Sequence, residues 1–161
     1  MNTSIFYRGN KFIVLKHTLT KDTAFICNYS AINNTVQSSY IVYTRGTINC
    51  SNVDGSFNFS RTSGDTTDTS EAVNIPHHLA FETPDDVAEF FCISKYNFYP
   101  VIRSAIKLNN NELHEANSTM VFLAAGTVVV DGNEIAAPNM IELSSTKTIR
   151  TKDSSWIIEL S

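Results

Sequence analysis

The sequence has little charge, few glycines and no long apolar segment. Charged residues make up 17% of its 161 residues, and the formal net charge is −4. A nucleic-acid-binding surface needs a basic face, so this balance argues against a nucleic-acid partner. The longest apolar runs, 120–125 and 127–130, fall far short of the roughly 20 residues that cross a bilayer, so we expect no membrane partner. The six glycines stand singly and form no phosphate-binding loop.

Cysteine is also scarce. Cys27, Cys50 and Cys92 are an odd number with wide spacing, which fits neither a disulfide framework nor a Cys-x-x-Cys metal site. We therefore expect three reduced thiols. Residues 1–12 lack an apolar stretch followed by a small-residue cleavage site, so we expect no signal peptide. A Gly-x-Ser-x-Gly nucleophile motif is also missing, and we predict no catalytic residue.

Uncharged polar residues and aromatics take the place of charge. Serine, threonine and asparagine together supply 50 residues, and ten Phe and six Tyr accompany them. These polar residues favour strands and turns over helix interiors, and aromatics favour strands. Short apolar runs recur every eight to twelve residues between polar turns, a pattern typical of a β-sandwich or barrel. The sequence predicts an all-β protein.

The chain repeats itself at an offset of 80 residues. An apolar segment over 40–45 ends in Gly46-Thr47, and a second over 120–125 ends in Gly126-Thr127. An Asp-Gly turn follows each, and each half then reaches an apolar-proline step, at Pro76 and at Pro138. We interpret the repeat as a tandem duplication in which the two glycines occupy equivalent turns.

Similar segments close the two halves, over 81–94 and 149–161. Alone, Thr83-Pro84 resembles a helix start, but the repeat favours a turn followed by a strand. We divide the chain into a first half over 1–80, with a polar insertion over 49–70, and a second over 81–161 that begins with the closing strand of the first. The aligned apolar side chains should form the core: Phe81, Phe90, Ile93, Ile149, Trp156 and Ile158.

Each half resembles a cupin. The resemblance rests on a strand that ends in glycine, a hairpin, a proline step and an aromatic-rich closing strand, and is best seen in Tyr40-Ile-Val-Tyr-Thr-Arg-Gly-Thr47 with Ile75-Pro-His-His-Leu-Ala-Phe81. It implies a tandem cupin-like β-sandwich or barrel, a jelly roll, with two related halves.

The same resemblance argues against cupin metal chemistry. The positions at which metal-binding cupins carry histidine and glutamate ligands hold other residues: Asn33, Thr35, Ser39, Phe81, Leu113 and Thr119. A longer histidine-to-glutamate spacing places Glu112 and His114 at the histidine positions of the second half. One imidazole cannot hold a transition ion, so we expect no metal and no cofactor.

The four histidines give no convergent site in the sequence. His77 and His78 are neighbours beside an expected strand, so one should be packed and the other exposed. His114 lies in an asparagine-rich segment and is expected in a solvated turn. His17, between Lys16 and Thr18, is expected at the surface.

Acidic residues gather in the middle of the chain. Residues 62–94 hold seven acids and no Lys or Arg. The segment is either an ordinary solvated face or a docking surface for a basic partner, with these candidate residues: Asp65, Asp68, Glu71, Asp85 and Asp86. Their spacing does not match a calcium-binding loop.

Two functions fit these observations. The first is a non-enzymatic virion component, such as a phage capsid decoration, neck or tail protein, because ligand positions are empty and the composition is typical of virion β-proteins. It would bind other particle proteins or form a homo-oligomer, since the terminal strand over 156–160 has little charge to protect it as a sheet edge. The alternative is a metal-free, cytoplasmic cupin that binds or isomerises a small molecule or carbohydrate.

Overall fold

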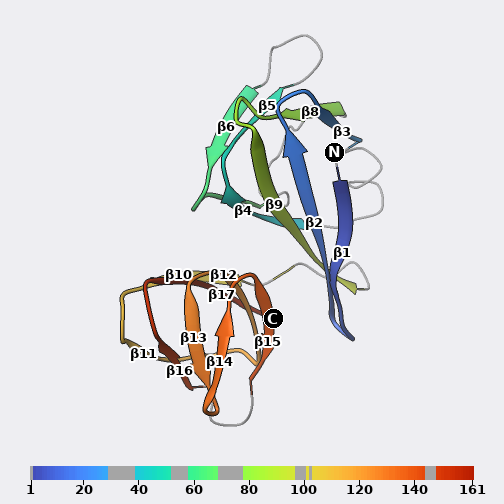
Figure 1. Cartoon of the computed structure of the whole chain (residues 1–161). Coiled ribbons are helices and arrows are strands. Elements are labelled where there is room, and N and C mark those ends of the chain that lie inside the picture. Colours follow the sequence, from blue (N-terminus) through green and yellow to red (C-terminus); the bar gives the residue numbers. More distant parts are fainter. Residues whose placement is uncertain are drawn as a thin grey trace. The chain divides into compact units, whose positions relative to one another are not determined.

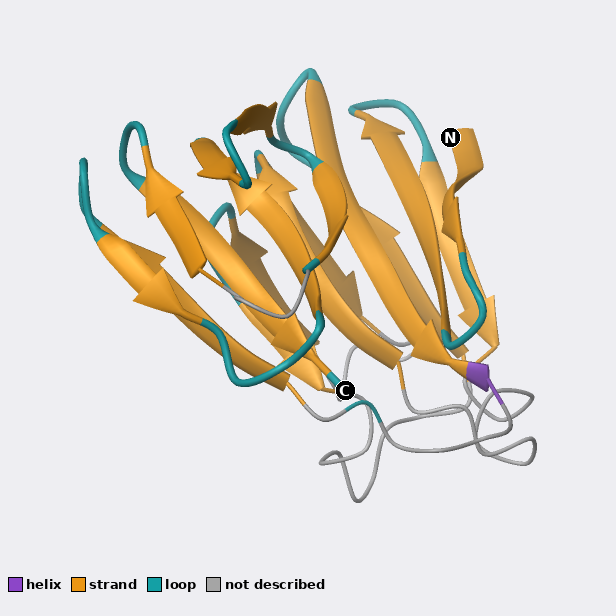
Figure 2. Ribbon diagram, turned by 90° about the horizontal axis from the view of Figure 1, so that it is seen from below, coloured by secondary structure: helices purple, strands orange, loops and turns teal. Residues whose placement is uncertain are grey.

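The computed structural model describes residues 2–28, 39–51, 58–68, 78–96, 101, 103–143 and 148–161. These residues lie mostly in antiparallel strands, which form two compact units, Met1–Val101 and Ile102–Ser161 (Figures 1 and 2). Among the described residues, no helix is long and apolar enough to cross a membrane. The prediction of an all-β protein is confirmed.

The first unit consists of two sheets. The β9 sheet has the order β1-β2-β9-β4-β7, and the β8 sheet has the order β3-β8-β5-β6. The strands are β1 (Asn2–Arg8), β2 (Phe12–Thr20), β3 (Ala24–Asn28), β4 (Ser39–Arg45), β5 (Thr47–Ser51), β6 (Asn58–Thr62), β7 (Thr66–Asp68), β8 (His78–Glu82) and β9 (Val87–Lys95).

The second unit repeats this arrangement. Its β17 sheet has the order β10-β17-β12-β15, and its β16 sheet has the order β11-β16-β13-β14. The strands are β10 (Arg103–Leu108), β11 (Leu113–Glu115), β12 (Met120–Ala125), β13 (Thr127–Val130), β14 (Asn133–Ala136), β15 (Asn139–Glu142), β16 (Thr148–Thr151) and β17 (Ser155–Leu160). Taken in chain order, β10–β17 match β2–β9 one for one, and β1 is additional. Two eight-stranded jelly rolls in tandem confirm the predicted duplication.

In both units the chain passes from one sheet to the other at equivalent residues, and we call this passage the corner. The register of β4 against β9 shifts between Tyr43 and Arg45, and that of β12 against β17 shifts between Leu123 and Ala125. The following glycine has a positive φ in each unit, +72° at Gly46 and +87° at Gly126. A bulge and a left-handed glycine together bend the chain out of one sheet and into the other. The predicted equivalence of the two glycines is confirmed.

An aspartate in the closing turn holds each corner. The N–H of Thr47 donates to Asp85 Oδ2 at 2.5 Å, and the N–H of Thr127 donates to Asp153 Oδ1 at 2.6 Å. The segment after Thr83 is a turn followed by strand β9, as the repeat predicted, and not a helix.

The neighbouring carbonyl is satisfied differently in the two units. In the second, the N–H of Lys152 donates to the carbonyl of Thr127 at 2.8 Å. The first unit has Pro84 at the position of Lys152, and proline has no N–H to donate. The hydroxyl of Thr83 donates to the carbonyl of Thr47 instead, at 2.6 Å.

The register corrects one landmark of the repeat. Ser63 donates its N–H to the carbonyl of Gly46, as Ala137 does to that of Gly126, so the equivalent of Pro138 is Gly64. Pro76 follows β7, whereas Pro138 precedes β15, the equivalent of β7. The pairing of the two prolines was therefore wrong, because strand register depends on cross-strand partners and not on similar dipeptides.

The polar insertion over 49–70 is also corrected. Strands β6 and β7 lie within it and have counterparts in β14 and β15, so it is not a loop excursion. The pairings place the extra length of the first unit in two connections. Compared with the second unit, the first has six additional residues at the β5–β6 connection and six additional residues at the β7–β8 connection. The Asp54-Gly55 turn lies outside the described residues. In the second unit, Asp131 and Gly132 both have positive φ in the expected two-residue hairpin turn.

The two compact units divide at Val101 and Ile102, and the strand over 87–95 lies in the first unit. The division predicted from the sequence, after residue 80, followed the offset of the repeat. It therefore assigned the closing strand of the first jelly roll to the second half.

All six residues that the repeat predicts as core are buried: Phe81, Phe90, Ile93, Ile149, Trp156 and Ile158. The terminal strand is not an exposed edge. Strand β17 pairs with β10 on one side and with β12 on the other, and all of its residues are buried. The expectation that this strand is an exposed sheet edge is wrong, so the strand gives no reason to expect a homo-oligomer.

Alanine at the two corner glycines should destabilise the protein more than alanine at a hairpin glycine. A Cβ at Gly46 would lie 2.8 Å from the Val87 carbonyl oxygen, and one at Gly126 would lie 2.5 Å from that of Ser154. Gly132 also has a positive φ but nothing within 4 Å, so Gly132→Ala reports the backbone strain alone, about 1–2 kcal/mol. Urea unfolding should show a larger loss for Gly46→Ala and Gly126→Ala. Equal losses in all three variants would contradict the role of the corner.

Candidate functional site

Strand register defines which side chains face the interior of each jelly roll. In the second unit, Ile149 and Ile157 belong to the buried core. His114 lies directly opposite Ile149 in the β11–β16 pair, so both side chains are on the inner face of the β16 sheet. Glu159 is two residues beyond Ile157 on β17 and shares the inner face of the β17 sheet. The two sheets thus direct one imidazole and one carboxylate into the same interior.

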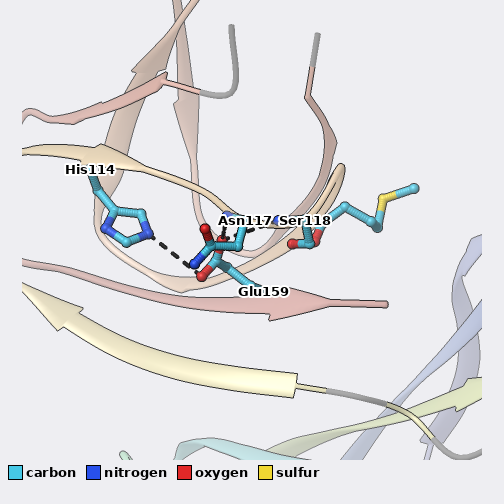
Figure 3. Close-up of polar contacts among 5 residues, drawn as sticks. His114, Asn117, Ser118 and Glu159 are labelled. Atoms are coloured by element: carbon cyan, nitrogen blue, oxygen red, sulfur yellow. Dashed lines mark hydrogen bonds and ion pairs between the residues drawn. The ribbon is translucent and has the colours of Figure 1, made fainter. Parts of the chain in front are cut away.

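These two side chains meet at one end of the sandwich (Figure 3). Glu159 has a side chain only 7% exposed, and its Oε1 accepts hydrogen bonds from the N–H groups of Asn117 (2.5 Å) and Ser118 (3.4 Å). Its Oε2 lies 3.7 Å from His114 Nε2. That distance is too long for a hydrogen bond, and the buried Nε2 has no hydrogen-bond partner among the residues that the structure describes.

The expectation that His114 is a solvated turn residue is wrong. His114 is the central residue of β11, and its side chain is mostly buried. The asparagines around it form the turn before the strand. In the sequence, His114 is two positions from the core residue Ala116, and this spacing would have placed both side chains on the same, inner face of the strand. Glu159 was not singled out, although it is a charged residue two positions from the buried Ile157.

The donor set does not fit a transition-metal site. Among the described residues, His114 and Glu159 are the ligating groups that we place on the inner face of the second unit, and one oxygen of Glu159 already binds two backbone amides. Of the other ligand positions inferred from the cupin pattern, Leu113 is 65% exposed and Phe81 lies in the core. In the described part of the chain, no three His, Cys, Asp or Glu side chains are grouped to hold an ion.

The expectation that His17 lies at the surface is wrong, because this histidine is buried in the first unit. His17 is only 5% exposed and stacks on Phe90, with ring centroids 4.7 Å apart. Its Nδ1 lies 2.9 Å from the Thr3 hydroxyl. His17 alternates with the buried Leu19 along β2, and this pattern outweighs the polar neighbours Lys16 and Thr18.

Three of the five acidic candidates have side chains that the structure describes, namely Asp65, Asp85 and Asp86. Asp65 is exposed in the β6–β7 turn, where its carboxylate accepts the N–H of Thr62 at 2.8 Å. Asp85 is half-buried at the corner, and Asp86 is exposed beside it. Asp68 is in β7, while its side chain and all of Glu71 lie outside the description, as do His77 and the side chain of His78. Two of the carboxylates therefore stabilise turns.

The sequence matches no protein-family model and no curated protein. Solved structures do resemble the chain. HutD from Pseudomonas fluorescens SBW25 is 11% identical with a TM-score of 0.66, and a cupin 2 conserved barrel domain protein from Leptotrichia buccalis is 10% identical with a TM-score of 0.60. Each match covers 99% of this chain and 87% of the other. The bacterial pirin YhhW from Escherichia coli, in complex with nickel(II), is 9% identical (TM-score 0.60; 91% and 80% covered).

The fold is therefore that of a tandem cupin, as the resemblance implied. The expectation of a virion component is wrong, because the structures that match almost the whole chain are cupin-fold proteins and nothing in them points to a particle. The error has a physical cause: jelly rolls serve capsids and cupins alike, and a surface rich in serine, threonine and asparagine suits any β-sandwich.

Acid should destabilise the first unit through His17. Burial lowers the pKa of His17 from its ordinary 6.5 to about 4. Between these values the unfolded chain binds a proton that the folded chain does not, so stability is complete above pH 6.5 and falls as the pH drops toward 4. At about 1.4 kcal/mol per pKa unit, the loss could reach about 3 kcal/mol. Urea unfolding across this range should show a smaller pH dependence for His17→Phe than for the wild type. Identical pH profiles for His17→Phe and wild type would contradict the assignment.

Proposed function

We propose that this protein is a metal-independent, small-molecule-binding cupin whose ligand contacts His114 and Glu159 in the second unit. One observation carries the proposal: a buried imidazole nitrogen, which has no hydrogen-bond partner among the described residues, lies 3.7 Å from an oxygen of a buried carboxylate. Buried polar groups normally have hydrogen-bond partners, so a nitrogen without one inside a jelly roll suggests a group that a ligand completes.

The chemistry of the pair favours a hydroxylated ligand. A hydroxyl can donate to Glu159 Oε2 and accept from His114 Nε2 when that nitrogen carries the proton. A ligand carboxylate at the same point would face the negative charge of Glu159. Sugars and other polyols therefore fit better than organic acids, and the proposal is a carbohydrate-type or polyol ligand held without a metal ion.

The nickel(II) complex of YhhW is a property of that protein, and in this chain the described His, Cys, Asp and Glu side chains form no group of three that could hold a metal ion. Elemental analysis of purified protein should find no stoichiometric transition metal. Stoichiometric zinc, iron, nickel or manganese would overturn the metal-independent part of the proposal.

The pair can be tested with two substitutions that preserve its surroundings. Glu159→Gln keeps an oxygen for the amides of Asn117 and Ser118 but removes the charge. His114→Phe uses the residue type that the register places at the equivalent position, Phe25 opposite Phe81. The control is Glu115→Gln, an exposed neighbour on the same strand.

Neutral sugars and polyols should shift the imidazole resonances of His114 in NMR titrations of the wild type. Both site variants should bind the active compound at least about tenfold more weakly, equivalent to about 1.4 kcal/mol, while Glu115→Gln should bind normally. A panel of sugars that leaves the His114 resonances unchanged, or binding unaffected by both variants, would contradict the proposal.

A further inference from the structure

The first unit has polar side chains where the second has apolar core residues. Ile48 lies opposite Arg61 and the equivalent Val128 lies opposite Ile135. In the same way Ile41 lies opposite Thr67, and Val121 lies opposite Ile141. Tyr43 and Leu123 precede the bulge at equivalent points. Three inner-face positions that hold Leu123, Ile135 and Ile141 in one jelly roll hold Tyr43, Arg61 and Thr67 in the other.

These three polar residues contact each other. The hydroxyl of Tyr43 lies 3.1 Å from Thr67 Oγ1, and Arg61 Nε donates to the same oxygen at 3.3 Å. The Arg61 guanidinium also lies 4.7 Å from the ring centroid of Phe59, which packs against the core. Tyr43 is fully buried, whereas Arg61 and Thr67 are half-buried. The cluster thus runs from the core of the first unit to the solvent.

Arg61 is held in place, and no side chain that the structure describes forms an ion pair with it. Nε bonds to Thr67, and Nη1 donates to the carbonyl of Ser60 at 3.0 Å, which leaves the Nη2 hydrogens without a hydrogen bond to the described residues. The carboxylates whose side chains the structure describes do not include Asp68 of β7, and their ion pairs are with other residues. Moving a guanidinium to an inner-face position costs free energy unless a partner compensates for the lost water.

We propose that Tyr43, Arg61 and Thr67 form a second binding site, in the first unit, for a small molecule that carries an oxyanion, either a carboxylate or a phosphate group. The planar guanidinium presents paired N–H donors that match the spacing of such oxygens. The site differs in charge from the His114–Glu159 pair of the second unit, and its existence does not depend on the function proposed for that pair.

The tyrosine hydroxyl adds a neutral contact to the site. Burial raises the pKa of Tyr43 above its ordinary value of 10, which the hydrogen bond with Thr67 only partly offsets. The phenol therefore keeps its proton at neutral pH and does not repel an anion. Thr67 connects the phenol to Arg61, so a bound oxyanion would complete a chain of hydrogen bonds that is open at the guanidinium.

Inorganic phosphate and acetate, each against sodium chloride of equal ionic strength, test the site directly. In the wild type, one or both anions should shift the Nε–Hε resonance of Arg61 in a saturable way at millimolar concentration and raise the midpoint of thermal unfolding. A response to phosphate alone identifies a phosphoryl ligand class, and a response to acetate identifies a carboxylate class.

Arg61→Met keeps an unbranched apolar stem against Phe59 and should fold, because the second unit has isoleucine at this position. The saturable stabilisation should disappear in this variant. It should persist in Arg150→Met, which removes an exposed arginine from a strand of the second unit. No saturable shift of Arg61 with either anion, an equal effect of chloride, or stabilisation that survives Arg61→Met would overturn the proposal.

Discussion

A hydrogen bond between a turn aspartate and a backbone amide organises each jelly roll. The amide of Thr47 or Thr127 follows the glycine at which the chain leaves the sheet of the closing strand and enters the opposite sheet. The aspartate, Asp85 or Asp153, lies in the turn where the chain returns to the first sheet. In each unit the bond therefore joins the two places where the chain changes sheet, the β4–β5 and β8–β9 connections in the first unit and the β12–β13 and β16–β17 connections in the second. It thereby fixes the relative register of the four strands that these connections link. Glycine is required at the corner because the φ is positive and the opposing turn approaches closely.

With that frame fixed, the inner faces of the two units have diverged without a change of fold. At equivalent positions, β9 carries Cys92 and β17 carries Glu159. Arg61 likewise stands where the second unit has Ile135, which packs against the core. The second unit places a buried carboxylate beside an imidazole, and the first places a guanidinium beside a phenol. Because the remaining inner-face residues are mostly apolar, each polar group requires a partner inside the protein or from a ligand. Duplication followed by divergence of this kind gives two interiors with different polar groups on one scaffold.

The sequence predicted those parts of the structure that local patterns encode. Short sequence patterns indicate Gly46 and Gly126, the turn after Thr83 and the buried closing strands. The duplication and the cupin-type fold could therefore be predicted. The pairing of Pro76 with Pro138 was wrong because register depends on partners far away in the chain. His17 and His114 were placed in solvent because their polar neighbours were weighed more heavily than the alternation of their strands. His114 and Glu159 lie on strands of opposite sheets, and their separation in the sequence does not indicate that the two side chains come together.

Amide hydrogen exchange of Thr47 and Thr127 tests the shared corner most directly. If Asp85 and Asp153 hold these amides, both should exchange slowly in the intact protein, with protection comparable to that of the neighbouring strand residues Ile48 and Val128. Asp85→Ala should accelerate exchange at Thr47 while leaving Thr127 protected, and Asp153→Ala should do the reverse. Fast exchange at both threonines in the wild type, or protection that neither substitution alters, would contradict the account of one corner built twice.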